Sequence, residues 1–313
     1  MAYYVFPDIA EEICACIQQN FEEGVYADID ESDFFAYALT THIQKVSQDK
    51  HLWIRWHPEL VPEYEGSLLQ SPENIEEFKQ RAKLDNYGIH KVERLPGNIG
   101  IIDIRYFFRT SWGSGETIVA AMNFLANMNA IIVDLRKCTG GNPGAVAMIC
   151  SYFFADEPIH LNSLYWRPSN RTDEFWTLKA LPGKRYPDVD LYVLTSNRTF
   201  SGAEEFTYNM KNLKRATIVG ETTGGGAHPV NQKPVDGQFV ITIPVGRAIN
   251  PISKTNWEGV GVKPDIEVAR DDALATAHLL ALRKIHERTR DEEWKSQLQR
   301  YIRQIERDLA AKK

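Results

Sequence analysis

Hydrophobic and polar residues alternate with a helical period near the start of the chain. Apolar positions recur every three or four residues over 8–25, which predicts a helix there. A stretch rich in capping residues at 29–33 predicts a second helix over about 34–46. The polar stretch 58–86 follows, and it contains a further helix start at Ser71. The first part of the chain is therefore predicted to be a helical unit.

The middle of the chain, from residue 98, alternates short apolar runs with segments of helical period. This alternation is typical of an α/β fold in which the strands pair in parallel. The predicted strands cover residues 99–107, 130–135, 189–195, 216–220 and 238–245, and the predicted helices cover 116–128, 145–154 and 203–213.

Two charged amphipathic segments, separated near residues 289–291, predict helices from about residue 273 to the last residue. The simpler interpretation is an appendage packed on the core, and the alternative is a contact between copies of the chain in a homo-oligomer. These changes of pattern divide the chain into a helical N-terminal cap over 1–90, a core over 91–270 and a helical C-terminal appendage over 271–313.

The composition is that of an ordinary folded protein, since 43% of its 313 residues are hydrophobic and 25% are charged. The net charge is -6 and no stripe of Lys and Arg stands out, so nucleic acid is not an expected partner. No window has the length of a membrane span, and residues 1–8 lack the features of a signal peptide. We therefore expect a cytoplasmic protein that binds no membrane.

The four cysteines do not form a recognisable metal motif. Cys14 and Cys16 are closer together than the usual zinc-site spacing, and no Cys/His cluster follows them. We interpret these two residues, together with Cys138 and Cys150, as small apolar residues and expect no metal site.

Ser201 lies where a predicted buried strand turns into a predicted helix. At such a turn the first backbone N–H groups of the helix are unpaired and the helix dipole favours negative charge. The turn would therefore support an alkoxide and an oxyanion, and Gly202 leaves room for a substrate carbonyl. The alternative is a capping box, in which Ser201 and Glu204 only start the helix.

A serine nucleophile also needs donors that hold the oxyanion. One candidate donor is Gly202, beside the serine. The other is the pair Gly140 and Gly141, shortly after a predicted buried strand, where backbone N–H groups are often exposed to a ligand. A plain tight turn into a helix remains the alternative for this pair.

Two of the eight histidines are candidates for the base that takes the serine proton. His51 ends the N-terminal helical unit, and His228 follows a run of glycines and would line a cleft. Because most histidines serve packing or the surface, spacing alone does not choose between these two.

Several segments, in their order along the chain, resemble motifs of the tail-specific or C-terminal processing serine peptidases. The resemblance runs from about residue 5 to residue 270. Residues 134–141 are similar to the family's Asp-Leu-Arg-x-Asn-x-Gly-Gly signature, with Cys138 in place of the asparagine. Residues 201–206 are similar to its nucleophile helix, and residues 215–225 are similar to the strand and turn after that helix. Residues 258–265 are similar to its closing Gly-Val-x-Pro-Asp element, and residues 49–51 are similar to its Asp-x-His.

This resemblance implies a ClpP/crotonase-like core of β-β-α units, a helical N-terminal cap, and acyl transfer through a serine. It also implies a peptide or unfolded protein as substrate, with no metal or organic cofactor.

The sequence departs from the familiar bacterial members, which use a Ser–Lys dyad. Gly226 holds the place of that lysine, and the next lysine, Lys233, lies beyond Pro229. The segment 52–91 is also too short for a PDZ-like insert. Both departures resemble the tricorn-like and retinoid-binding-protein-like branch.

The tricorn-like resemblance, transferred residue by residue, implies a catalytic set. His51 would be the general base, Ser201 the nucleophile and Glu258 the residue that supports the site. The oxyanion donors would be Gly202 and one of Gly140 or Gly141. Without the resemblance, Glu258 would be interpreted as a solvated loop carboxylate.

Two other functions remain open at the level of sequence. Relatives that bind retinoids reuse this core, so a non-catalytic module for an apolar small molecule is one alternative. The other is a specialised acyl hydrolase or transferase that uses the same serine on a small molecule.

Overall fold

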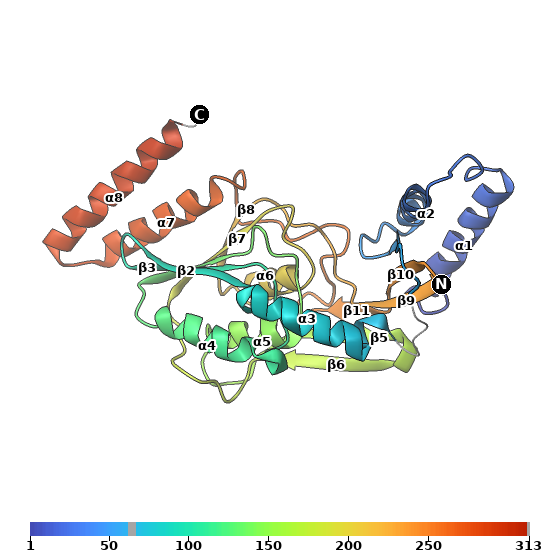
Figure 1. Ribbon diagram of the computed structural model, residues 1–313. Coiled ribbons are helices and arrows are strands. Elements are labelled where there is room, and N and C mark those ends of the chain that lie inside the picture. Colours follow the sequence, from blue (N-terminus) through green and yellow to red (C-terminus); the bar gives the residue numbers. More distant parts are fainter. Residues whose placement is uncertain (62–66, 312–313) are drawn as a thin grey trace. The chain divides into compact units, whose positions relative to one another are not determined.

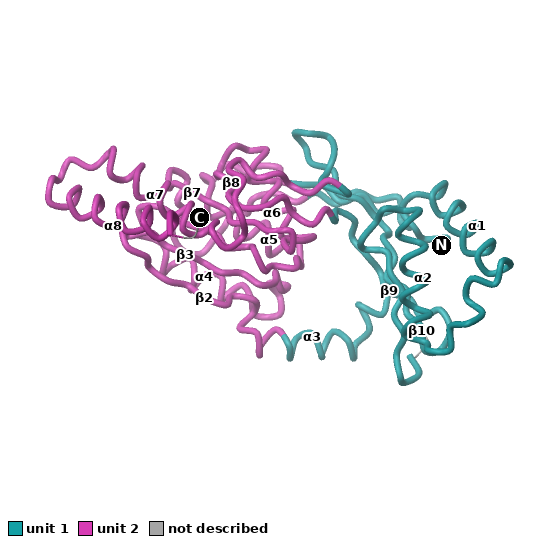
Figure 2. Tube along the Cα trace, turned by 90° about the horizontal axis from the view of Figure 1, so that it is seen from above, with its two compact units in different colours: residues 1–81, 162–174, 226–259 teal, residues 82–161, 175–225, 260–313 magenta. Residues whose placement is uncertain are grey.

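The computed structural model describes residues 1–61 and 67–311, which divide into two compact units (Figure 1; Figure 2). Each unit is assembled from three separated stretches of the chain. Unit 1 comprises Met1–Arg81, Asn162–Glu174 and Gly226–Gly259, and unit 2 comprises Ala82–Leu161, Phe175–Gly225 and Val260–Lys313.

A six-stranded sheet forms the centre of unit 2, with the strand order β12-β8-β7-β4-β3-β2. All neighbouring strands are parallel except β2, which pairs antiparallel with β3. The inner strand β4 is buried at every position, as expected for a sheet covered on both faces. The strands are β2 (Ile89–Leu95), β3 (Ile99–Ile104), β4 (Ala130–Asp134), β7 (Asp190–Thr195), β8 (Thr217–Gly220) and β12 (Ile266–Glu267).

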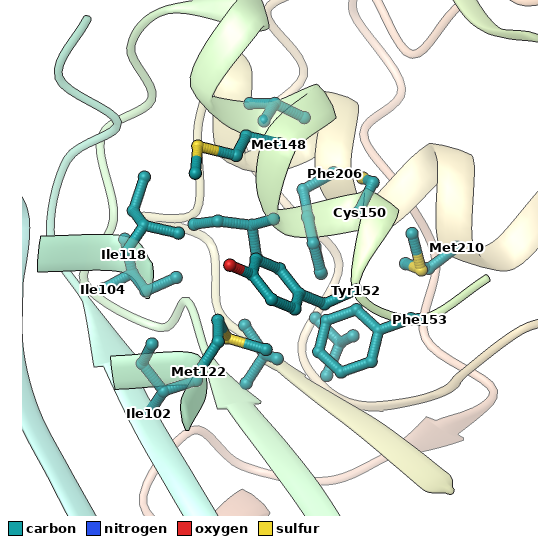
Figure 3. Packing of buried hydrophobic residues seen from close by; sticks show 14 of the residues in the cluster. Ile102, Ile104, Ile118, Met122, Met148, Cys150, Tyr152, Phe153, Phe206 and Met210 are labelled. Atoms are coloured by element: carbon teal, nitrogen blue, oxygen red, sulfur yellow. The ribbon is translucent and has the colours of Figure 1, made fainter. Parts of the chain in front are cut away.

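Helices cover the two faces of this sheet. Successive residues of a strand point to opposite faces, so Ile131 and Ile132 belong to different core clusters. On one face, Tyr152 and Phe206 pack among residues of α4, α5 and α6 (Figure 3). On the other face lie α7 and α8. The helices are α4 (Ser114–Phe124), α5 (Pro143–Ser151), α6 (Gly202–Asn212), α7 (Ala273–Arg288) and α8 (Glu292–Ala310).

The C-terminal helices pack on unit 2. Leu282 of α7 and Leu298 of α8 are fully buried in the second core cluster. Burial of these apolar stripes is what the interpretation as a packed appendage requires. The contact between copies of the chain stays a prediction.

Unit 1 contains the N-terminal helices and two small sheets, ordered β1-β10-β9 and β11-β5-β6. Its core includes Tyr4, Ile13, Ile43 and Leu52. The elements, some of which extend beyond the unit, are α1 (Pro7–Glu22), α2 (Ser32–Ser47), α3 (Pro72–Leu84), β1 (Trp53–Trp56), β5 (His160–Trp166), β6 (Arg171–Trp176), β9 (Val230–Asp236), β10 (Phe239–Pro244) and β11 (Gly246–Ile249).

The fold class is the expected one, a mixed α/β protein with helices near both ends of the described chain. The elements β2, β3 and α4 form one β-β-α unit of the kind that the family resemblance implies. Among the described residues, no helix combines the length and the apolar character needed to cross a membrane.

The sequence pattern does not predict several strands, namely β1, β2, β5, β6, β9, β11 and β12. The sequence of β9, for example, contains no apolar run that would predict a strand, and none of its residues is fully buried. Part of the polar stretch 58–86, residues 62–66, lies outside the described residues. All four cysteines are free; Cys138 and Cys150 are buried, whereas Cys14 is exposed.

Candidate active site

Ser201 occupies the turn between β7 and α6 in unit 2 and has an unusual backbone conformation. Its φ is 52° and its ψ is -121°. Positive φ is disfavoured for residues with a Cβ atom, and such conformations cluster at functional sites. Two hydrogen bonds tie the turn to the segment after β4: Thr199 Oγ1 donates to the Leu135 carbonyl oxygen at 2.8 Å, and Phe200 N–H donates to the Cys138 carbonyl oxygen at 3.1 Å.

A buried carboxylate fixes the serine turn. The backbone N–H of Ser201 donates to Glu204 Oε2 at 2.9 Å. The other oxygen, Oε1, accepts the Thr223 hydroxyl at 2.5 Å and the Gly225 N–H at 2.6 Å. Glu204 has no solvent exposure. The sequence identified Glu204 only as a capping residue, whereas the structure gives it further contacts outside the helix.

Of the three predicted oxyanion glycines, Gly140 lies against Ser201 and Gly141 lies against Gly202, the residue after the serine. A Cβ atom on Gly140 would lie 2.7 Å from the Ser201 Cβ, and one on Gly202 would lie 2.9 Å from the Gly141 carbonyl oxygen. Both Gly140 and Gly141 have positive φ, at 112° and 131°. Glycine is therefore required here, both for the positive φ and for the close approach of the backbone.

Strand β3 continues into Phe107, which fixes the glycine loop. Phe107 N–H donates to the Gly140 carbonyl oxygen at 2.8 Å, and Asn142 N–H donates to the Phe107 carbonyl oxygen at 2.7 Å. Asn142 then caps α5, because its side chain accepts the Gly144 N–H at 3.0 Å. The loop is thereby held by the strand before it and the helix after it.

A second polar cluster, in unit 1, is centred on Asp49. His228 Nδ1 lies 2.6 Å from Asp49 Oδ2, and the Tyr4 hydroxyl donates to the same oxygen at 3.2 Å. The backbone N–H of His51 donates to Asp49 Oδ1 at 3.0 Å. Asp49 and His228 are 1% and 4% exposed, so this pair is almost completely removed from water.

Glu258 completes this cluster. Its Oε2 lies 3.4 Å from His228 Nδ1 and accepts the Ala227 N–H at 2.5 Å. One potential ligand atom from each of Asp49, His51 and Glu258 lies within 4.8 Å of the others, so these three residues have the donor types that a metal ion would need. The two Asp49 oxygens already accept hydrogen bonds, which a metal would have to replace.

Burial lowers the pKa of the His51 imidazole to about 4. Desolvation of the charged ring is the main cause, nearby His228 adds to it, and Asp49 opposes it. His51 is therefore neutral at pH 7, which is the protonation state that a general base needs before it accepts a proton.

The structure groups the predicted residues in two sets. Ser201 lies with its three candidate glycines in unit 2, and His51, His228 and Glu258 lie together in unit 1. The sequence assigned no role to Asp49, although it is the first residue of the Asp-x-His motif. Tyr4 gave no sequence signal, because its contact with Asp49 joins residues 45 positions apart.

Two family models match the chain. The model of peptidase family S41 matches residues 98–268, and a model described as the N-terminal domain of peptidase S41 in eukaryotic IRBP matches residues 1–84. The first match covers more than half of the chain and includes Ser201 and the glycine loop. The chain therefore belongs to family S41 of the serine peptidases.

Solved structures that match this chain with a TM-score above 0.5 are similar to it in fold. A putative peptidase from Parabacteroides merdae is 18% identical with a TM-score of 0.55, over 79% of this chain and 83% of that one. The tricorn protease is 14% identical with a TM-score of 0.55, over 91% of this chain but 35% of that one. A photosystem II D1 C-terminal processing protease is 20% identical with a TM-score of 0.45, over 55% of this chain and 43% of that one. The chain thus spans less than half the length of two of these three proteins.

Proposed function

We propose that the protein is a serine peptidase that cleaves peptides or C-terminal tails through an acyl-enzyme. The observation that carries this proposal is Ser201, held at positive φ at the start of α6, with Gly140 against its Cβ and Gly141 against Gly202. A serine that serves only as a helix cap has no need of this strained backbone or of a glycine loop packed on it.

In the proposed reaction, Ser201 Oγ attacks the scissile carbonyl and His51 takes its proton. The negative charge that develops on the carbonyl oxygen is held by the N–H of Gly202 and by that of Gly140 or Gly141. Gly202 is the first residue of α6, where the helix has no acceptor for its N–H. His51 then returns the proton to the leaving amine, and water releases the acyl group by the same route.

The carboxylates near His51 are proposed to stabilise its imidazolium form. Glu258 and Asp49 both lie within reach of the ring. They supply negative charge in a buried site, where charge interactions are strong. Glu258 is thus proposed as the supporting residue, and Asp49 fixes the backbone of His51 through its N–H.

A fluorophosphonate probe tests the proposal, because it phosphonylates only an activated serine. We expect wild-type protein to be labelled at Ser201, and Ser201→Ala and His51→Ala to remain unlabelled. His57→Ala is the matched control, since His57 lies outside the Asp49 cluster, and it should label like wild type. Labelling of His51→Ala at the wild-type rate would contradict the assignment of the base.

A second measurement identifies the substrate class. Digestion of a peptide library by wild type but not by Ser201→Ala would support a peptidase. Labelling at Ser201 without any peptide cleavage would favour an acyl hydrolase acting on small molecules. An unlabelled protein that takes up a lipophilic fluorophore would favour the binding module.

A further inference from the structure

We propose that Glu204 is a positioning residue, whose buried carboxylate holds Ser201 in the conformation needed for nucleophilic attack. This inference rests on the proposed function of Ser201. Glu204 belongs to α6, has no solvent exposure and accepts three hydrogen bonds from outside or at the very start of its helix.

The hydrogen bonds use both oxygens of the carboxylate. Oε2 accepts from Ser201, and Oε1 accepts from Thr223 and Gly225. An ionised carboxylate is an acceptor only, so three converging donors match its charge and leave it stable although buried. A capping box needs only the first of these contacts. The other two tie the serine turn to a different part of the sheet.

The two turns that Glu204 joins follow neighbouring parallel strands. Ser201 comes after β7, and Thr223 comes after β8. Thr223 is itself fixed, because its Oγ1 accepts the Val262 N–H at 2.7 Å. The strained positive φ of Ser201 persists only if several surrounding contacts fix it. The Glu204 carboxylate provides one of these contacts, because it accepts a hydrogen bond from the Ser201 N–H itself.

The same contact decides which amide can serve the oxyanion. The Ser201 N–H already donates to Glu204, so it is not available to an oxyanion. The next backbone N–H, that of Gly202, has no acceptor within the helix and can donate to the oxyanion. Glu204 therefore sets both the backbone conformation of the nucleophile and the choice of oxyanion donor.

Glu204→Gln is the variant that tests this role. Glutamine has nearly the same shape but one acceptor oxygen and one NH₂ donor, so it cannot satisfy Ser201 on one side and Thr223 with Gly225 on the other. Thr223→Val removes one donor, whereas Thr223→Ser keeps it. Thr207→Val is the matched control, because Thr207 is buried in α6 and its hydroxyl donates within the helix to the Ala203 carbonyl oxygen at 2.8 Å.

The readout is the fluorophosphonate labelling rate as a function of probe concentration, with thermal unfolding measured on each variant. We expect Glu204→Gln to lower the maximal labelling rate by roughly tenfold or more at unchanged half-saturating concentration. Thr223→Val should lower the maximal labelling rate less than Glu204→Gln does. Thr223→Ser and Thr207→Val should both have the wild-type rate.

Two failures are distinguishable. If wild type itself is not labelled at Ser201, the proposed function is wrong and the positioning role goes with it. If wild type is labelled and folded Glu204→Gln reaches the same maximal rate, only the positioning role is wrong. Should Glu204→Gln not fold, the comparison of Thr223→Val with Thr223→Ser decides, and equal maximal rates would overturn the inference.

Discussion

His228 and Asp49 form a buried hydrogen-bonded pair, with Nδ1 of the imidazole 2.6 Å from Oδ2 of the carboxylate. The two residues are 179 positions apart, so the pair joins the first stretch of unit 1 to its last stretch. Because Asp49 also accepts from His51 and Tyr4, it is the centre of the polar cluster in unit 1. This arrangement makes Asp49 as informative a target for mutation as His51.

Asp49→Asn is expected to destabilise the protein by about 3 kcal/mol, because it leaves buried donors without a charged acceptor. Tyr4→Phe is the matched control: it removes a single hydrogen bond of 3.2 Å and should cost about 1 kcal/mol. Urea unfolding measures both free energies. Equal unfolding midpoints for the two variants would contradict the central role of Asp49.

The lowered pKa of His51 predicts a pH-dependent stability. The folded-state pKa of about 4 lies below the ordinary 6.5, so between these values the unfolded chain binds a proton that the folded chain does not. The free energy of unfolding should therefore fall as the pH drops from 6.5 to 4, by up to about 3 kcal/mol. His51→Gln lacks this loss. Parallel pH profiles for wild type and His51→Gln would refute the shift.

The conformation of Ser201 predicts that the nucleophile is held at a cost to stability. Ser201→Gly should be more stable than Ser201→Ala by about 1 kcal/mol, because glycine adopts positive φ freely. The same two substitutions at Ser296, exposed on α8, should show the reverse order, since alanine is favoured inside helices. Thermal unfolding of the four variants checks both orders.

Gly140→Ala should slow labelling of Ser201 by roughly 100-fold or more, the loss typical of a disturbed oxyanion donor. The added Cβ would lie 2.7 Å from the Ser201 Cβ, so the loop must move. Gly115→Ala is the control, because its Cβ would meet nothing closer than 3.6 Å. If Gly140→Ala is labelled as fast as Gly115→Ala, the loop does not take part in stabilising the oxyanion.

Much of the arrangement around Ser201 in unit 2 could be predicted from the sequence, because its determinants are local. Ser201 and Gly202 are neighbours in the chain, and Gly140 and Gly141 follow β4 closely. The resemblance to serine peptidases rested on these short motifs, and the S41 family match confirms it. The assignment of His51 and Glu258 to catalysis, the cytoplasmic location and the domain boundaries stay predictions.

Only the tertiary structure decided the partners of these residues. Glu204 meets Thr223, and Asp49 meets His228, across 19 and 179 positions of sequence. A periodic pattern reports which face of a helix or strand is apolar, and a motif reports a turn. Neither reports which polar groups share a buried volume, because that depends on how distant segments pack, and buried polar groups are then stable only where donors and acceptors match.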